Sequence, residues 1–330
     1  MPRVLIAPKV LQDVTGPYRD VLADAGFELI YPESVESLGE VSGLLATLRD
    51  FEIDAVIAGM EPFTAEVLEK SRLRVIARMG VGYDLVDVPA ATQHGVAVTI
   101  TPGTNEPSVA EQMFALLLAV SRAVVTRQER EVRSGHWRRQ ARTRLAGKTL
   151  GLVGLGRIGK AIVPRATGFG MSVIACEPMP DRQFTEAHGV RLCTLDELLR
   201  EADVVSLHAP ATPETLDMIN ADSLAKIKRG AILINTARGT LVDEDALVDS
   251  LRSGHLLGAG LDVFKVEPLP LDSPLLELDN VVLAPHMAGL DVESEVAMSR
   301  LAAQCIADLH QGRWPEGCVV NETIRTGWKW

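Results

Sequence analysis

The chain has 330 residues, an apolar share of 47%, a charged share of 23% and a formal net charge of −11. This length provides material for two domains with separate cores, and the composition is that of an ordinary soluble protein. An acidic surface repels nucleic acid and anionic membranes, so neither is an expected partner.

Short apolar runs alternate with amphipathic stretches over the first hundred residues. This alternation predicts βαβ units, and therefore a parallel sheet of five strands in a doubly wound domain. The predicted strands are residues 4–7, 27–31, 54–58, 73–78 and 97–101, and the predicted helices are residues 17–25, 41–50, 64–70 and about 87–94.

The pattern changes after residue 101. Residues 108–125 predict a long, strongly apolar helix, and residues 127–144 predict a basic, disordered-looking connector. A second set of alternating strands and helices follows, and residues 292–310 predict a last long helix. The predicted strands of this second parallel sheet are residues 149–153, 171–176, 191–193, 203–208, 230–236, 257–263 and 280–284.

The four cysteines and the N-terminus bear on metal content and location. No two cysteines form a Cys-x-x-Cys pair and no spacing is typical of zinc, so we expect no metal and a reducing compartment. The N-terminus is typical of a strand rather than a signal peptide, and no apolar run reaches the roughly 18 residues of a membrane helix. We therefore expect a cytoplasmic protein.

A glycine motif opens the second sheet. Gly154, Gly156 and Gly159 form a Gly-x-Gly-x-x-Gly sequence directly after a predicted strand and at the start of a helix. This arrangement is the fingerprint of a dinucleotide site, because it allows a tight turn, close approach of a pyrophosphate and close helix–strand packing. Glu177 follows the next strand, where an acid accepts the ribose hydroxyls and repels a 2′-phosphate. The motif favours NAD over NADP, although the nearby Arg182 leaves NADP open.

Arg238, Glu267 and His286 each lie just beyond a later predicted strand. The carboxyl ends of parallel strands meet at one edge, so we expect these side chains to converge beside the dinucleotide site. His286 can donate a proton to a carbonyl oxygen, and Glu267 can orient and stabilise the imidazolium. Arg238 can bind a carboxylate and polarise the carbonyl. Any one of them could be structural, but together they predict hydride transfer between NAD(H) and C2 of a small 2-hydroxy or 2-keto acid.

Longer motifs extend over nearly the whole chain. They are RMGVGYDLVD at 78–87, NEPSVAEQ at 105–112, LAGKTLGLVGLGRIG at 145–159, LHAPATPET at 207–215, INTARGTLVDEDAL at 234–247, GAGLDVFKVEPLP at 258–270 and APHMAG at 284–289. In these motifs the chain resembles the D-isomer-specific 2-hydroxyacid dehydrogenases, especially their phosphoglycerate dehydrogenase-like branch. The resemblance implies two doubly wound parallel-sheet α/β domains. A Rossmann cofactor domain, residues 102–285, is inserted into a flavodoxin-like substrate domain made of residues 1–101 and 286–330.

The resemblance also implies roles for individual residues and a homodimer joined through the cofactor domain. Arg238, Glu267 and His286 are the implied catalytic residues. Substrate contacts are implied for Arg78, Met79, Gly80, Val81 and Gly82, and cofactor contacts for Gly154, Gly156, Arg157, Ile158, Gly159, Glu177, His208, Ala237, Asp262 and Gly289.

Several positions depart from the family pattern. Leu85 stands where the family often has asparagine, and the residues after His286 differ from those of phosphoglycerate dehydrogenases. These departures disfavour 3-phosphoglycerate as the substrate. So does the expectation that no regulatory domain follows residue 330. Val81 disfavours phosphite as the substrate, and Glu267 disfavours formate.

The substrate and even the class of function have alternatives. Phosphoglycerate, glycerate or hydroxypyruvate, a lactate-type acid and a sulfonated hydroxy acid all stay open as substrates. One hypothesis is that Arg78 and the basic cluster between Arg138 and Arg144 hold a second anionic group of the substrate. The alternative is that the cluster is a solvated connector. The alternative to an enzyme is an NAD(H)-sensing, corepressor-like binding protein.

Overall fold

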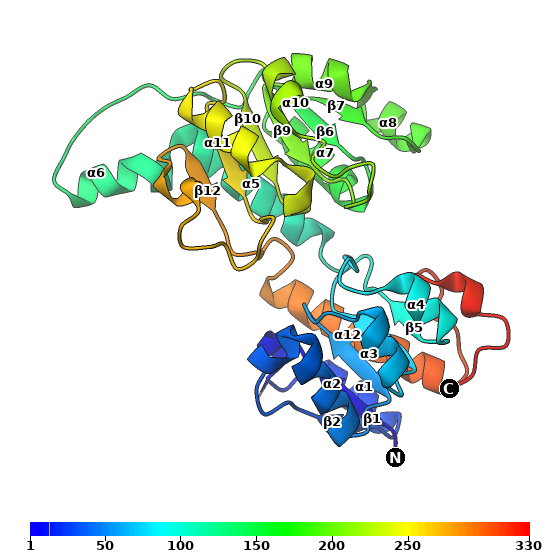
Figure 1. Ribbon diagram of the computed structural model, residues 1–330. Coiled ribbons are helices and arrows are strands. Elements are labelled where there is room, and N and C mark those ends of the chain that lie inside the picture. Colours follow the sequence, from blue (N-terminus) through cyan, green and yellow to red (C-terminus); the bar gives the residue numbers. More distant parts are fainter. Residues whose placement is uncertain (13) are drawn as a thin grey trace. The chain divides into compact units, whose positions relative to one another are not determined.

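The computed structural model of the protein describes residues 1–12 and 14–330. The chain divides into two compact units, shown in Figure 1. Unit 1 contains Met1–Asn105 and Leu290–Trp330, and unit 2 contains Glu106–Gly289. Each unit has its own all-parallel sheet covered by helices, which confirms the predicted fold class.

Unit 1 is built on five short strands. Its elements are β1 (Arg3–Ile6), η1 (Lys9–Leu11), α1 (Pro17–Asp24), β2 (Glu28–Ile30), η2 (Glu36–Gly39), α2 (Val41–Asp50), β3 (Ala55–Ala58), α3 (Ala65–Lys70), β4 (Val75–Arg78), α4 (Val88–Gln93), β5 (Ala97–Thr99), α12 (Val292–His310) and η6 (Glu322–Ile324). The strand order β2-β1-β3-β4-β5 is that of flavodoxin-like folds. Every residue of β3 and β4 is buried, as expected for parallel strands covered by helices on both faces.

Unit 2 is built on seven strands. Its elements are α5 (Glu106–Arg122), η3 (Val124–Gln128), α6 (Glu129–Arg133), β6 (Thr149–Val153), α7 (Arg157–Gly168), β7 (Ser172–Cys176), α8 (Arg182–His188), β8 (Arg191–Leu192), α9 (Leu195–Glu201), β9 (Val204–Leu207), α10 (Ala221–Lys226), β10 (Ile232–Asn235), η4 (Gly239–Leu241), α11 (Glu244–Arg252), β11 (Gly258–Leu261), η5 (Pro274–Glu277) and β12 (Val281–Leu283). The order β12-β11-β10-β9-β6-β7-β8 is the Rossmann order with an added edge strand. The order in which the chain adds strands reverses between β6 and β9, because β7 and β8 lie on one side of β6 and β9 to β12 on the other. Ligands of such sheets bind at the carboxyl ends of the strands at this point.

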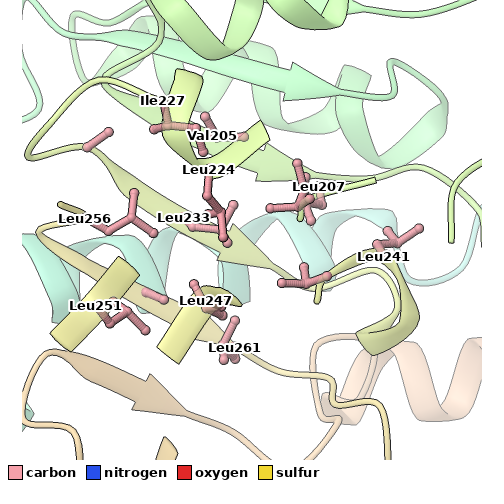
Figure 2. Packing of buried hydrophobic residues seen from close by; sticks show 14 of the residues in the cluster. Val205, Leu207, Leu224, Ile227, Leu233, Leu241, Leu247, Leu251, Leu256 and Leu261 are labelled. Atoms are coloured by element: carbon pink, nitrogen blue, oxygen red, sulfur yellow. The ribbon is translucent and has the colours of Figure 1, made fainter. Parts of the chain in front are cut away.

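Two hydrophobic cores cover the two faces of the unit 2 sheet. On one face, leucines of α9, α10 and α11 pack on the strands, and Figure 2 shows Leu224 and Leu247 against Leu233 and Leu261. On the other face, α5 and α7 cover the same strands. Truncating one such buried leucine to alanine costs about 2–5 kcal/mol, so this packing holds the helices firmly on the strands.

The connector after α5 differs in part from its prediction. The helix ends at Arg122, and Ala123 adopts a left-handed φ of 51° before a π-helical turn. The basic stretch 127–144 then contains the short helix α6, which the sequence pattern did not indicate. An ion pair of 2.8 Å between Arg133 and Glu129, four residues apart, supports this helix.

Within residues 1–12 and 14–330, no single helix combines enough length and apolar character to cross a membrane. Only α5 and the segment Val124–Arg133 meet that criterion as a pair, and they are bent by 52° relative to each other.

Candidate active site

Arg238, Glu267 and His286 follow β10, β11 and β12, which are neighbours in the sheet of unit 2. The structure brings the last two into contact, with Nδ1 of His286 2.6 Å from Oε2 of Glu267. The other carboxylate oxygen, Oε1, accepts a hydrogen bond of 2.9 Å from the backbone N–H of Phe264. Glu267 is thus held by its own loop and presents one oxygen to the imidazole.

The charge state of Glu267 follows from its neighbours. Burial raises its pKa, but the hydrogen bonds from His286 and Phe264, together with the charges of His286 and Arg238, outweigh burial. The pKa of Glu267 therefore lies below its ordinary value of 4.5, and the carboxylate is ionised at neutral pH. An ionised carboxylate only accepts hydrogen bonds, so Nδ1 carries a hydrogen and Nε2 is the ring atom left to exchange a proton.

The backbone around His286 is held by Asp262. His286 has a φ of 54°, which is uncommon for a residue other than glycine. Its N–H donates to the Asp262 carbonyl oxygen at 2.8 Å. The Asp262 carboxylate accepts from Met287 at 3.0 Å and from Ala288 at 2.8 Å. Because Asp262 is 0% exposed, burial raises its pKa despite these amides, the His286 charge and a hydrogen bond from Gln112.

Arg238 is positioned by two residues that the sequence analysis missed. Asn235, which is 1% exposed, donates from Nδ2 to the Arg238 carbonyl oxygen at 2.8 Å and accepts from Ala237 N–H at 3.0 Å. A Cβ on Gly239 would lie 1.9 Å from the Phe264 carbonyl carbon, so only glycine allows this approach. The only sequence signal for this pair is an asparagine at a strand end and a glycine directly after the arginine.

The glycine motif forms the loop between β6 and α7. Gly154 has a φ of 99°, and a Cβ there would lie 2.6 Å from the His208 carbonyl oxygen. A Cβ on Gly159 would lie 2.6 Å from the Gly154 carbonyl oxygen. A Cβ on Gly156 would meet no described atom within 4 Å, and no described side chain caps the N-terminus of α7. Open space beside uncapped helix amides fits a pyrophosphate, so these residues suit a dinucleotide.

Glu177 lies directly after β7, where the sequence analysis expected the ribose acid. Its Oε2 accepts from Leu155 N–H at 2.8 Å, and its Oε1 accepts from Met179 N–H at 3.0 Å. The carboxylate therefore ties the glycine loop to the end of β7.

His208 follows β9 and is half-buried. Its Nε2 lies 2.8 Å from the hydroxyl of Ser206, while its buried Nδ1 has no partner among the residues that the structure describes. Burial lowers the pKa of His208 to about 3, so its imidazole is neutral at physiological pH. His208 is therefore no source of protons for a reaction near neutral pH.

The predicted substrate loop belongs to unit 1 and follows β4. Arg78, which is 8% exposed, donates from Nε to the Gly82 carbonyl oxygen at 2.9 Å and from Nη1 to that of Ala58 at 3.0 Å. The Gly80 carbonyl oxygen accepts from Thr101 N–H at 3.0 Å, and Gly80 has a φ of 150°. Arg78 thus uses two of its donor groups to shape the loop.

The remaining predicted contacts lie at strand ends and helix starts. Arg157 is exposed and Ile158 half-buried at the start of α7. Ala237 is half-buried in the turn after β10, and Gly289 is the last residue of unit 2.

Comparison with known proteins places this geometry in a family. Residues 114–288 match the model of the D-isomer specific 2-hydroxyacid dehydrogenase NAD binding domain. The chain is 42% identical over 282 residues to a glyoxylate reductase of Korarchaeum cryptofilum, covering 83% of this chain and 85% of that protein. It is 40% identical over 338 residues to a D-3-phosphoglycerate dehydrogenase of Mycobacterium leprae, covering 98% of this chain but 61% of that protein.

A solved structure agrees over almost the full length. The D-lactate dehydrogenase of Aquifex aeolicus, solved with NAD and lactic acid, superposes with a TM-score of 0.84 at 30% identity, covering 96% of this chain and 98% of that one. The chain belongs to the D-isomer specific 2-hydroxyacid dehydrogenase family. The predicted family, the enzyme class and NAD as cofactor are confirmed, and the dehydrogenase is an NAD-dependent oxidoreductase.

The arginine cluster of this dehydrogenase lies on the connector of unit 2. Arg142 donates to Oε1 of Gln140 at 2.9 Å, and Arg127 donates to the same oxygen at 3.1 Å. Arg138 and Arg139 are exposed. These contacts identify no ligand, so a second anion at the cluster stays a hypothesis.

Proposed function

We propose that this dehydrogenase reduces a small 2-keto acid to the D-2-hydroxy acid, with His286 as the proton donor. The observation that carries the proposal is the 2.6 Å contact between His286 Nδ1 and an ionised Glu267. The His286 side chain is 35% exposed, whereas Nδ1 of His208 is buried and its Nε2 lies against the Ser206 hydroxyl.

The roles of the three side chains follow from their chemistry. When bound, NADH supplies the hydride that is added to C2 of the keto acid. Nε2 of His286 donates a proton to the carbonyl oxygen and takes it back in the oxidative direction. Glu267 stays ionised and stabilises the positive charge of the imidazole. Arg238 binds the substrate carboxylate and polarises the carbonyl, as a guanidinium can do with paired hydrogen bonds.

Backbone groups complete the proposed binding sites. Among the described residues, the amides of Val81 and Gly82 have no hydrogen-bond acceptor, so they are available for the substrate carboxylate. Their loop is held by Arg78, which supports a role in shaping the loop rather than in binding a second anion. The first-turn amides of α7 would hold the pyrophosphate of NAD, and Glu177 its ribose hydroxyls.

Hydroxypyruvate, and glyoxylate, whose product glycolate has no stereocentre, are the substrates we propose first. A relative named glyoxylate reductase is 42% identical to this chain. The engagement of Arg78 with two backbone carbonyls also leaves less of its guanidinium for a phosphate. A phosphorylated or sulfonated keto acid held by the arginine cluster is the competing hypothesis.

A substrate panel tests the proposal. The purified chain is mixed with NADH or NADPH and with glyoxylate, hydroxypyruvate, pyruvate, phosphohydroxypyruvate or sulfopyruvate, and the loss of nicotinamide absorbance is followed. We expect NADH-dependent turnover, highest for glyoxylate or hydroxypyruvate, that disappears in His286→Ala. Tight binding of NADH without turnover of any 2-keto acid would instead support an NAD(H)-sensing binding protein.

The homodimer and the cytoplasmic location stay predictions. Light scattering during size-exclusion chromatography measures the mass of the particle directly. A mass of one chain, 35.6 kDa, at the working concentration would exclude the dimer.

A further inference from the structure

Two cysteines lie side by side at the edge of the unit 2 sheet. Cys176 ends β7, and Cys193 directly follows β8. Ala175 and Leu192 are register partners, and Cys193 N–H donates to the Ala175 carbonyl oxygen at 3.0 Å, so the next pair in register is Cys176 and Cys193. Neighbouring strands lie about 4.8 Å apart, within the range of about 4.4–6.8 Å that Cα atoms span in disulfides.

The two thiols share a face of the sheet and have access to solvent. Both side chains pack against the hydrophobic cluster formed by α9, α10 and α11, so they point to the same side. The Sγ of Cys193 lies 3.8 Å from the Ala175 carbonyl oxygen, next to the Cys176 peptide. Both cysteines are half-buried, whereas Cys305 and Cys318 in unit 1 are 0% and 8% exposed.

Cys176 is joined directly to the residue that anchors the glycine loop. Glu177 is next in the chain, and its carboxylate accepts from Leu155 N–H at 2.8 Å. A covalent link that moves Cys176 toward β8 therefore also moves the Glu177 backbone. This displacement would change both the bond to Leu155 and the carboxylate proposed to hold the ribose.

We propose that Cys176 and Cys193 are an oxidation site, and that joining them as a disulfide weakens binding of the adenosine end of NAD. The second half of this proposal rests on the ribose-binding role proposed for Glu177. With a peroxide as oxidant, one thiolate attacks an oxygen, and the peroxide O–O bond breaks to give a sulfenic acid and one water. The second thiol then forms the S–S bond and releases the second water, so two thiols lose two electrons to one peroxide.

A dissolved disulfide serves as the alternative oxidant. One cysteine thiolate attacks it to give a mixed disulfide and one free thiol, and the other cysteine then displaces the second thiol. Burial raises the pKa of Cys176, and so does the negative charge of Glu177. Burial also raises the pKa of Cys193, outweighing the positive charge of Arg191. Because only thiolates react, oxidation is slow at neutral pH, and the experiment uses excess oxidant and long incubation.

Mass spectrometry and NADH binding test the proposal together. Trypsin cuts after Arg165, Arg182, Arg191 and Arg200, so the two cysteines fall in separate peptides, residues 166–182 and 192–200. After treatment with hydrogen peroxide or oxidised glutathione, we expect these two peptides to be linked. We also expect the dissociation constant of NADH, measured by fluorescence, to rise about tenfold, as for the loss of one hydrogen bond to a charged group. Dithiothreitol should reverse both changes.

Variants separate this pair from the other cysteines. Cys176→Ser and Cys193→Ser should each bind NADH before treatment and show no rise afterwards, whereas Cys305→Ala should respond like the unmodified chain. A chain that forms no link between the two peptides, or one whose link leaves NADH affinity unchanged, would overturn the proposal. Turnover of 2-keto acids by the reduced chain tests the proposed function alone, so the two failures are distinguishable.

Discussion

Two histidines at strand ends of the same sheet have opposite surroundings. His208, after β9, is half-buried, with Ser206 on one ring nitrogen, the other ring nitrogen buried and a pKa lowered to about 3 by burial. His286, after β12, is 35% exposed and contacts the ionised carboxylate of Glu267. A position at the carboxyl edge of a parallel sheet is therefore not sufficient for acid–base chemistry. The charged partner Glu267 distinguishes His286 from His208.

The largest expected difference is in catalysis. His286→Ala should lower kcat/KM for the best 2-keto acid by about 10²–10⁴-fold, the usual contribution of a general acid. His208→Ala should act mainly on NADH binding and lower the turnover number far less. Steady-state kinetics at saturating NADH measure both, with circular dichroism to check folding. Equal losses of kcat in the two variants would remove the distinction between these histidines.

A change in the support of His286 should have the next largest effect. Asp262→Asn leaves one of the amides of Met287 and Ala288 without its carboxylate acceptor, at a cost of up to about 3 kcal/mol. We expect a lower melting temperature and a lower kcat. Asp279→Asn is the matched control, because Asp279 is an exposed aspartate paired with Arg130, and such pairs contribute about 0–1 kcal/mol. Equal effects of the two substitutions would contradict the role given to Asp262.

The pH dependence of stability should single out His208. Its pKa is lowered in the folded state, so the unfolded chain takes up its proton first, and stability is lost as pH falls from about 6.5 toward 3. At pH 5 this loss is about 2 kcal/mol, and His208→Gln, which keeps a hydrogen-bonding side chain but cannot take up a proton, should not show it. Denaturant unfolding at pH 7 and pH 5 measures the difference. Parallel losses in both proteins would show that folding does not lower the pKa of His208.

The sequence was sufficient for the parts of the site that depend on local pattern. Glycines in register after β6, an acid after β7 and three polar strand ends all follow from the spacing of residues near one another in the chain. The parts that could not be predicted depend on contacts between distant segments. Gly239 is required by the Phe264 backbone, and Asp262 braces residues after β12, which a single strand pattern does not reveal.

Contacts between distant segments also account for other features that the sequence did not predict. The glycine loop after β6 lies against the backbone of His208, and neither segment alone indicates this contact. The role of Arg78 in holding its loop appears only once β3 places the Ala58 carbonyl beside it. In the connector, the prediction relied on charge content, whereas the ion pair between Glu129 and Arg133 accompanies a helix.

The smallest expected effect concerns the partner of His208. Ser206→Ala removes the only described hydrogen bond of the imidazole and should destabilise the chain by about 1 kcal/mol with little change in kcat. Thermal unfolding and steady-state kinetics measure these quantities. A loss of turnover comparable to that of His286→Ala would place His208 in the chemistry after all.

The pairing of His286 with Glu267 is tested most directly by the pH profile of kcat/KM for keto acid reduction, in the unmodified chain and in Glu267→Gln. The pKa of Glu267 is lowered, so its charge is present at and above neutral pH and is lost only as pH falls below its ordinary range. Removing that charge should therefore move the alkaline limb of the profile to lower pH, because the charged imidazole loses its stabilising partner. An alkaline limb at the same pH in both proteins would contradict the account.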